Sequence, residues 1–234
     1  MAQAAASTIA RALASTLDNN RHIASGLSPD APFKWWSAML RWLPGSPMMT
    51  SLEGNAAAGI MFTYSPLTAG EAQSALAIEG VSNSGGDSER NFTDAGSKDT
   101  GGGSALLASI ADSDFSDLVA YMRPEFLPVA PRVQAYMDAS RHNFYLAHGP
   151  FLFVAYLGVD PSQQGRGLGS KLLKVALDRA DAAGQWAYLE ATNERNAELY
   201  KRHGFGVIEV MRWPVPGLEA PHKLIIMARE PPQS

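Results

Sequence analysis

Residues 159–169 read VDPSQQGRGLG, and this stretch decides the fold. An apolar run over residues 151–159 leads into it, and a run with helical patterning over residues 170–183 follows it. Glycines let a backbone approach an anion closely, and the start of a helix directs free N–H groups and a positive dipole end toward that anion. We therefore predict a strand, a phosphate-binding loop and a helix, in this order.

The last third of the chain alternates regularly around this loop. The patterns predict strands at 151–159, 186–191, 205–213 and 222–229, and helices at 167–183 and 193–202, with Gly184 and Gly204 as helix stops. A β-α-β-α order makes the first two strands parallel with a right-handed crossover, whereas the last two form an antiparallel pair. The sequence thus predicts an α/β (α+β) protein with a mixed central sheet flanked by helices.

The first half of the chain is less regular. We expect helices at 8–17 and 32–43, and a hairpin of strands 48–52 and 56–64 around Gly54-Asn55. The tryptophan-rich stripe of the second helix is read either as core or as part of a substrate pocket. Residues 82–104 are mostly Gly, Ser, Asp, Asn and Thr, and are predicted to be a disordered insertion. Helices are expected near 113–122 and 131–140.

Composition narrows the function. The 234 residues, 46% of them hydrophobic, suit one domain over residues 1–234. The net charge of −4 and the absence of a basic run argue against a nucleic-acid partner. The absence of cysteine excludes disulfides, thiolate zinc sites and a cysteine nucleophile, and no His/Asp/Glu cluster suggests a metal.

Two features bear on location. The longest clean apolar run, residues 151–157, is far shorter than the roughly 20 residues of a membrane helix, so we expect no membrane partner and a cytoplasmic protein. Residues 1–17 are rich in Ala, Ser and Thr, which fits either an N-terminal helix or an organelle presequence.

The loop is compared first with two nucleotide-binding motifs. A Walker A loop fails, because Ser170 separates Gly169 from Lys171. A dinucleotide fingerprint has the spacing Gly-x-Gly-x-x-Gly, whereas this loop has Gly-x-Gly-x-Gly, although Glu190 ends the next strand as a ribose-binding acid would.

A third motif fits. Gln164-x-x-Gly167-x-Gly169 resembles the pyrophosphate-binding motif of the GNAT superfamily of N-acetyltransferases. The flanking segments LGVDP (157–161), LEATNERN (189–196), LY (199–200) and GF (204–205) match that family in order and spacing. The resemblance covers residues 145–230 and points to the branch that contains puromycin N-acetyltransferase. It implies a splayed strand pair that forms an acetyl-CoA cleft, with acetyl-CoA as the cosubstrate.

The resemblance also implies a set of cofactor-binding residues. Backbone N–H groups of the loop and first helical turn would hold the coenzyme A pyrophosphate, and Gly167 and Gly169 would leave room for its approach. The N–H of Val159 or its neighbour would polarise the thioester carbonyl. Gly158 fits a strand bulge near Leu157-Gly158, or is simply a strand-end glycine. The complete set is Leu157, Val159, Gln164, Gly165, Arg166, Gly167, Leu168, Gly169, Ser170 and Asn196.

The helix at 193–202 carries Asn193, Asn196 and Tyr200 at positions i, i+3 and i+7, a spacing that places all three on one face. Asn193 is expected to be its N-cap. Asn196 resembles the family asparagine that binds the coenzyme, and Tyr200 resembles the general acid that protonates the departing thiolate, the alternative being a packed tyrosine. Glu190, at a strand end, is read either as the general base acting through water or as a solvated acid.

Together these residues predict an acetyl-CoA-dependent N-acetyltransferase that acts on a small-molecule amine by direct attack. The alternative is a non-catalytic acyl-CoA-binding or regulatory module built on the same fold.

Overall fold

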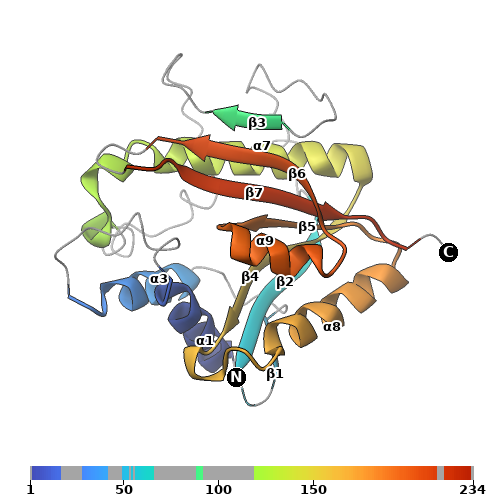
Figure 1. Cartoon of the computed structure of the whole chain (residues 1–234), viewed down its shortest axis with the longest axis horizontal. Coiled ribbons are helices and arrows are strands. Elements are labelled where there is room, and N and C mark those ends of the chain that lie inside the picture. Colours follow the sequence, from blue (N-terminus) through green and yellow to red (C-terminus); the bar gives the residue numbers. More distant parts are fainter. Residues whose placement is uncertain are drawn as a thin grey trace.

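The computed structural model describes residues 2–16, 28–41, 49–52, 54, 56–65, 88–91, 119–214 and 219–232. Its centre is a seven-stranded sheet in the order β1-β2-β4-β5-β7-β6-β3 (Figure 1). The strands are β1 (Met49–Leu52), β2 (Ala57–Tyr64), β3 (Ser88–Asn91), β4 (Phe151–Val159), β5 (Ala187–Ala191), β6 (Gly206–Trp213) and β7 (His222–Arg229). The helices are α1 (Ala2–Ala14), α3 (Ala31–Arg41), α7 (Ala130–His148), α8 (Leu168–Ala182) and α9 (Glu194–Lys201), with 3-10 turns η1 (Pro124–Phe126) and η2 (Pro161–Gln163).

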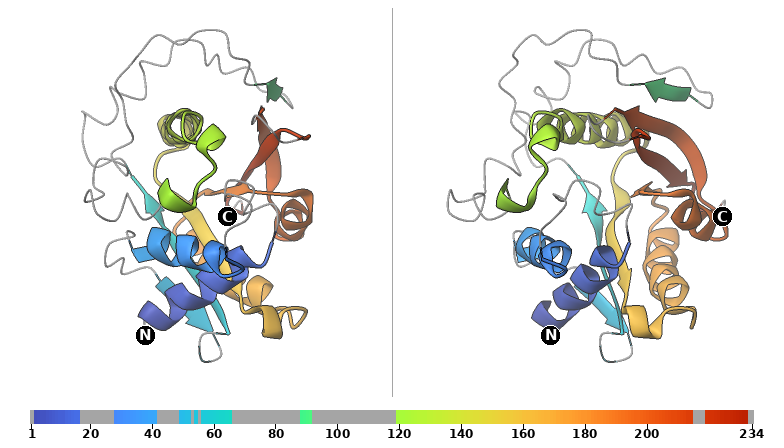
Figure 2. Two further views of the ribbon diagram at one scale, coloured as in Figure 1. Left: turned by 90° about the vertical axis from the view of Figure 1, so that its left-hand side faces the viewer. Right: turned by 60° about the vertical axis from the view of Figure 1, so that its left-hand side comes forward.

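The sheet is mixed, and helices cover both of its faces. Helices α1, α3 and α7 lie on one side, and α8 and α9 lie on the other (Figure 2). Strands β4 and β5 are parallel, whereas β1 with β2 and β6 with β7 are antiparallel. The fold class predicted from the alternation of strands and helices is confirmed.

Strand β4 separates the two cores because successive side chains of a strand point to opposite faces. Leu152 and Val154 pack with the apolar side of α8, and Phe151 and Phe153 pack with α7. All four side chains are buried. The continuous apolar run that the sequence showed at 151–159 therefore reflects a strand covered on both faces.

Helix α1 crosses β4 at very short range. A Cβ built on Gly158 would lie 2.9 Å from the Cα of Ile9 and 3.0 Å from the Cβ of Ala12. Ile9 is fully buried, and it belongs to a third core with Ala58 and Ile60 of β2. Gly158 is therefore required by the approach of α1.

Three expected elements have different limits. Helix α1 runs from Ala2 to Ala14 rather than over 8–17, and Leu17 lies outside the described residues. Helix α7 continues past Ser140 to His148, where Gly149 ends it with a φ of 73°. The polar segment after Ser140 hid this extension, because one face of the helix is polar. Of the helix expected at 113–122, residues 113–118 lie outside the described residues, and 119–121 are helical.

The insertion predicted at 82–104 contains a strand. Residues 88–91 form β3, which pairs in parallel with β6 from Glu209 to Arg212. An edge strand is held by main-chain hydrogen bonds, so the low apolar content of this segment does not preclude it. The other residues of 82–104 lie outside the described part of the chain, as do residues 215–218 between the last two strands. Within the described residues no helix is long and apolar enough to cross a membrane.

We expect Gly158→Ala to lower the free energy of unfolding by about 1–3 kcal/mol, because its Cβ meets the backbone of Ile9 and overpacking costs this much. Chemical denaturation measures the change. Gly206→Ala is the matched control, since a Cβ there meets only the carbonyl oxygen of Ala228, at 4.0 Å. Equal stability of the two variants would contradict the close packing of α1.

Candidate functional site

Strands β4 and β5 separate toward their C-terminal ends. Their parallel pairing covers only three residues of β4, from Leu152 to Val154, although β4 continues to Val159. The separation begins at a bulge. Ile60 and Met61 of β2 pair with Tyr156 and Val154, so Ala155 is an extra residue in β4. A bulge bends the strand that carries it, and here it takes β4 away from β5.

The bulge expected near Leu157-Gly158 therefore lies two residues earlier. Periodicity could not locate it, because the run 151–159 is apolar at nearly every position. The presence of glycine at position 158 is explained instead by its close contact with α1.

Two amides of β4 face the gap that this separation leaves. The N–H of Asp160 donates to the carbonyl of Ala56 next to β2, at 2.9 Å. In an antiparallel ladder every second residue bonds to the same neighbour, so Gly158 bonds toward β2 as well. The N–H groups of Leu157 and Val159 then point the other way, toward β5, with which neither residue is paired.

The glycine loop joins this gap to α8. Asp160 stabilises the turn η2 by accepting from the N–H of Ser162 at 3.0 Å. Gly165 and Gly167 have φ values of 82° and 74°, in the left-handed region that favours glycine. No side chain caps the N-terminus of α8, and its first turn holds no acidic residue.

The backbone conformations explain why glycine occurs at positions 167 and 169 for different reasons. A Cβ on Gly167 would meet no heavy atom within 4 Å, so its backbone conformation is what calls for glycine there. At Gly169 the φ is ordinary, and a Cβ would lie 3.4 Å from Cγ2 of Val159. The uncapped N–H groups of Leu168, Gly169 and Ser170 have no acceptor one helical turn earlier, which makes this terminus suited to an anion.

Side chains also contact the loop. Gln164 donates from Nε2 to the carbonyl of Val159 at 3.3 Å, and Arg166 donates to Gln163. The hydroxyl of Ser170 lies 3.0 Å from Nε2 of His203. Burial, followed by the charge of Arg202, lowers the pKa of His203 below its ordinary value. Sequence analysis missed this histidine as a contact of the loop.

Helix α9 presents the predicted polar face. Asn193 is its N-cap, as expected, and accepts from the N–H of Asn196 at 2.8 Å. The amide side chain of Asn196 lies 3.5 Å from the hydroxyl of Thr192. Tyr200 is half-buried against the core beneath α8, edge-on to Phe205 at 5.9 Å between ring centroids. Burial raises the pKa of Tyr200 to about 12, so its hydroxyl is protonated at neutral pH.

Glu190 is held in an ion pair. Its two carboxylate oxygens accept from Nε and Nη2 of Arg141 on α7, each at 2.8 Å. The side chains are only 13% and 11% exposed for Arg141 and Glu190, so the pair is largely shielded from water. Burial alone would lower the pKa of Arg141, but the carboxylate of Glu190 raises it above the ordinary value.

This ion pair favours a structural role for Glu190 over the two roles that its sequence position suggested. Arg141 also donates to Asp138 and lies over the ring of Phe153, 4.8 Å from its centroid. The ion pair thus links α7 to β5 on the face of the sheet that α7 covers. Arg141 was missed because the helix was expected to end at Ser140.

Tyr156 lies beside the bulge, on the face of the sheet that carries α1 and α3. Its ring is edge-on to Trp36 at 6.3 Å between centroids, so part of the tryptophan stripe adjoins the gap. Burial raises the pKa of Tyr156 to about 12. In the described part of the chain, no group of three or more His, Asp or Glu residues could hold a metal ion.

Comparison with known proteins finds a match to a family model in this region. Residues 116–205 match the model of the Acetyltransferase (GNAT) family. The match spans α7, β4, the glycine loop, α8, β5 and α9, which together form the gap and the uncapped helix start.

Several solved structures are also similar. A protein described as histone acetyltransferase HPA2 and related acetyltransferase, from Corynebacterium glutamicum, is 29% identical over 36% of this chain and 44% of its own, with a TM-score of 0.30. The Drosophila melanogaster polyamine N-acetyltransferase is 16% identical over 74% of this chain and 68% of its own, with a TM-score of 0.42. The matched region thus spans less than half of the Corynebacterium protein.

We expect Arg141→Met to lower the free energy of unfolding by about 3–5 kcal/mol, because it leaves the Glu190 carboxylate buried without its partner. Adding Glu190→Gln should recover part of this loss. Denaturant titration measures both. Lys174→Met, which breaks the exposed pair of Lys174 with Asp178, is the control and should cost less than about 1 kcal/mol. A loss in Arg141→Met no larger than in the control would show that the pair does not hold α7.

Proposed function

Because residues 116–205 match the GNAT acetyltransferases, we propose that the chain is an acetyl-CoA-dependent N-acetyltransferase acting on a small-molecule amine. The single observation that carries the proposal is the set of backbone N–H groups beside the glycine loop that have no β5 partner or no side-chain cap. It begins at the N–H groups of Leu157 and Val159 and ends at the uncapped first turn of α8.

The residues present fit coenzyme A. The first turn of α8 offers three N–H groups and no acidic side chain, which suits a pyrophosphate. The open space at Gly165 and Gly167 leaves that surface uncovered by side chains. The gap between β4 and β5 offers strand amides to the amide-bearing pantetheine arm. Acetyl-CoA, when bound, supplies an acetyl thioester.

In this proposal, the chain's own groups have distinct tasks. The N–H of Val159 polarises the carbonyl that is attacked, as donors in an oxyanion hole do. Tyr200 donates its phenolic proton to the leaving sulfur, and its pKa of about 12 keeps the proton in place at working pH. Asn196 and Ser170 contribute side-chain contacts to the coenzyme.

The ion pair supports a third role for Glu190, besides the general base and the solvated acid that its sequence position suggested. With both oxygens held by Arg141, it is poorly placed to take a proton from the amine. We propose that Glu190, through its ion pair with Arg141, holds β5 in place beside the gap. Direct attack then relies on an amine that arrives uncharged or loses its proton to water.

The acceptor class rests on the sequence resemblance to the puromycin N-acetyltransferase-like branch. A thiol-release assay with acetyl-CoA and a panel of small amines tests it, with peptides that have free N-termini as the comparison. Binding of acetyl-CoA without thiol release from any amine would favour the non-catalytic acyl-CoA-binding module. Release only with peptides would move the acceptor to proteins.

We expect acetyl-CoA at a hundredfold excess over its Kd to raise the Tm by about 5 °C or more, because binding to the folded state stabilises it. Gly169→Val should abolish this shift, since its side chain would enlarge the contact with Val159 and cover the helix start. Scanning fluorimetry measures both. Val175→Ala, on the exposed side of α8, is the control and should keep the shift. A full shift in folded Gly169→Val would refute coenzyme binding at this loop.

We expect Tyr200→Phe to lower kcat by roughly 10²–10⁴-fold with nearly unchanged affinity for coenzyme A, because one proton donor is lost and little packing. Since the pKa of Tyr200 is about 12, ionisation of this group should cause no loss of wild-type turnover up to about pH 10. Steady-state kinetics across pH and calorimetry measure these effects.

Tyr145→Phe on α7 is the control, since it removes a phenolic hydroxyl on the face of the sheet opposite to α9 (Figure 2). If Tyr200→Phe turns over like the wild type, with chemistry rate-limiting, then Tyr200 only packs.

A further inference from the structure

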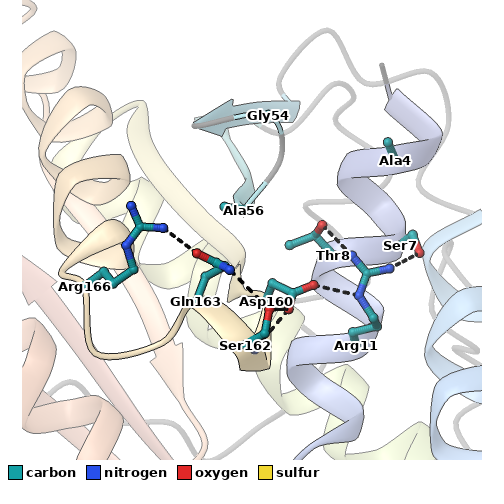
Figure 3. Close-up of a pocket in the computed structure, with 10 residues that line it drawn as sticks. All are labelled: Ala4, Ser7, Thr8, Arg11, Gly54, Ala56, Asp160, Ser162, Gln163 and Arg166. Carbon is teal, nitrogen blue, oxygen red and sulfur yellow. Dashed lines mark hydrogen bonds and ion pairs between the residues drawn. The ribbon is translucent and has the colours of Figure 1, made fainter.

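Helix α1 reaches the glycine loop through one side chain. Nε of Arg11 donates to Asp160 at 2.9 Å, across 149 residues of sequence (Figure 3). The other two nitrogens of the guanidinium donate within α1, to Ser7 at 2.8 Å and to Thr8 at 3.1 Å. Thr8 is buried in the packed part of α1, so the bonds to Ser7 and Thr8 fix the orientation of the Arg11 guanidinium.

Asp160 is the residue at which β4 becomes the loop. One of its carboxylate oxygens accepts from both the N–H and the hydroxyl of Ser162, at 3.0 and 2.7 Å, and the other accepts from Arg11. Its own N–H donates to the carbonyl of Ala56. Asp160 thereby sets the direction in which the chain leaves β4 toward Gly165.

The charge of Asp160 is stable at neutral pH. The hydrogen bonds from Ser162, followed by the contact with Arg11, lower the pKa of Asp160 below its ordinary value. A depressed carboxyl pKa means that the contact is present above the unfolded value near 3.8 and is lost only as the pH falls through the lower folded value. The pairing with Arg11 is thus constant over the pH range of an activity assay.

A polar pocket of about 550 Å³ adjoins this contact, on the side of the loop that faces α1. Figure 3 shows Arg11 and Arg166 on opposite sides of it, with Asp160 between them. Each of the three nitrogens of Arg11 already donates to a protein atom, and these bonds hold the guanidinium against Asp160.

We propose that Arg11 is a positioning residue, which holds the pyrophosphate-binding loop through Asp160 in the arrangement that receives coenzyme A. This inference rests on the proposed function. The turn after Asp160 leads directly to the two left-handed glycines and the first turn of α8, so a shift at Asp160 displaces the N–H groups there. Because the Arg11 side chain is 44% exposed, its loss should disturb the loop more than the stability of the fold.

The test separates binding of the pyrophosphate from the rest of the reaction. Arg11→Met should raise the KM for acetyl-CoA by about two- to fivefold, because the loop position can cost no more than the exposed ion pair that holds it, with kcat unchanged. The kcat/KM for S-acetylpantetheine, which lacks the pyrophosphate, should not change. Arg11→Lys should recover part of the affinity. Lys34→Met, which breaks the exposed pair of Lys34 with Asp30, is the control.

A double-mutant cycle identifies the route. Asp160→Asn keeps an oxygen for Ser162 but removes the charge that Arg11 pairs with, so adding Arg11→Met to it should raise the KM no further. An equal loss with acetyl-CoA and with S-acetylpantetheine would overturn the inference, as would a KM of Arg11→Met equal to that of the wild type. Failure of the wild-type protein to bind coenzyme A in calorimetry would instead overturn the proposed function.

Discussion

The separation of β4 from β5 is the constraint on which the rest of the structure depends. Two parallel strands in the middle of a sheet normally satisfy each other's backbone groups along their whole length. Here the pairing ends at Val154, and the bulge at Ala155 turns the remainder of β4 toward β2. Backbone donors in the middle of the sheet are thereby left for something other than protein, and the uncapped start of α8 lies at the end of the same strand.

An opened sheet needs support from both faces. On one face, α8 packs on Leu152 and Val154 with buried leucines, so the helix whose start faces the gap is anchored over the intact part of the sheet. On the other face, the ion pair of Arg141 with Glu190 ties α7 to β5 just where β5 loses β4 as its neighbour.

The sequence predicted the second half of the fold well, because each element there carries its own local signal. Periodicity indicated the strand at 151–159 and the helix after Gly167 with nearly the limits that the structure has. Gly204, with its positive φ, follows the last helix as the capping pattern indicated. The N-cap role of Asn193 followed in the same way. Nonlocal features were not predictable. The bulge at Ala155, the partner of Glu190 and the contact of His203 with Ser170 depend on residues that only the tertiary structure brings together. The edge strand β3 was missed because main-chain pairing leaves little trace in composition.

The contact of α1 with β4 has a consequence for how the chain folds during its synthesis. Helix α1 is synthesised before β4, and the loop residue that Arg11 contacts is made 149 residues after Arg11. At the usual rate of translation this interval is on the order of ten seconds, which is long compared with the formation of a helix. For most of this interval β2 is already made, but the apolar side of α1 around Ile9 still lacks β4, the second strand against which it packs. The packing of α1 is therefore completed only after β4 has been made, and its apolar side needs shielding until then.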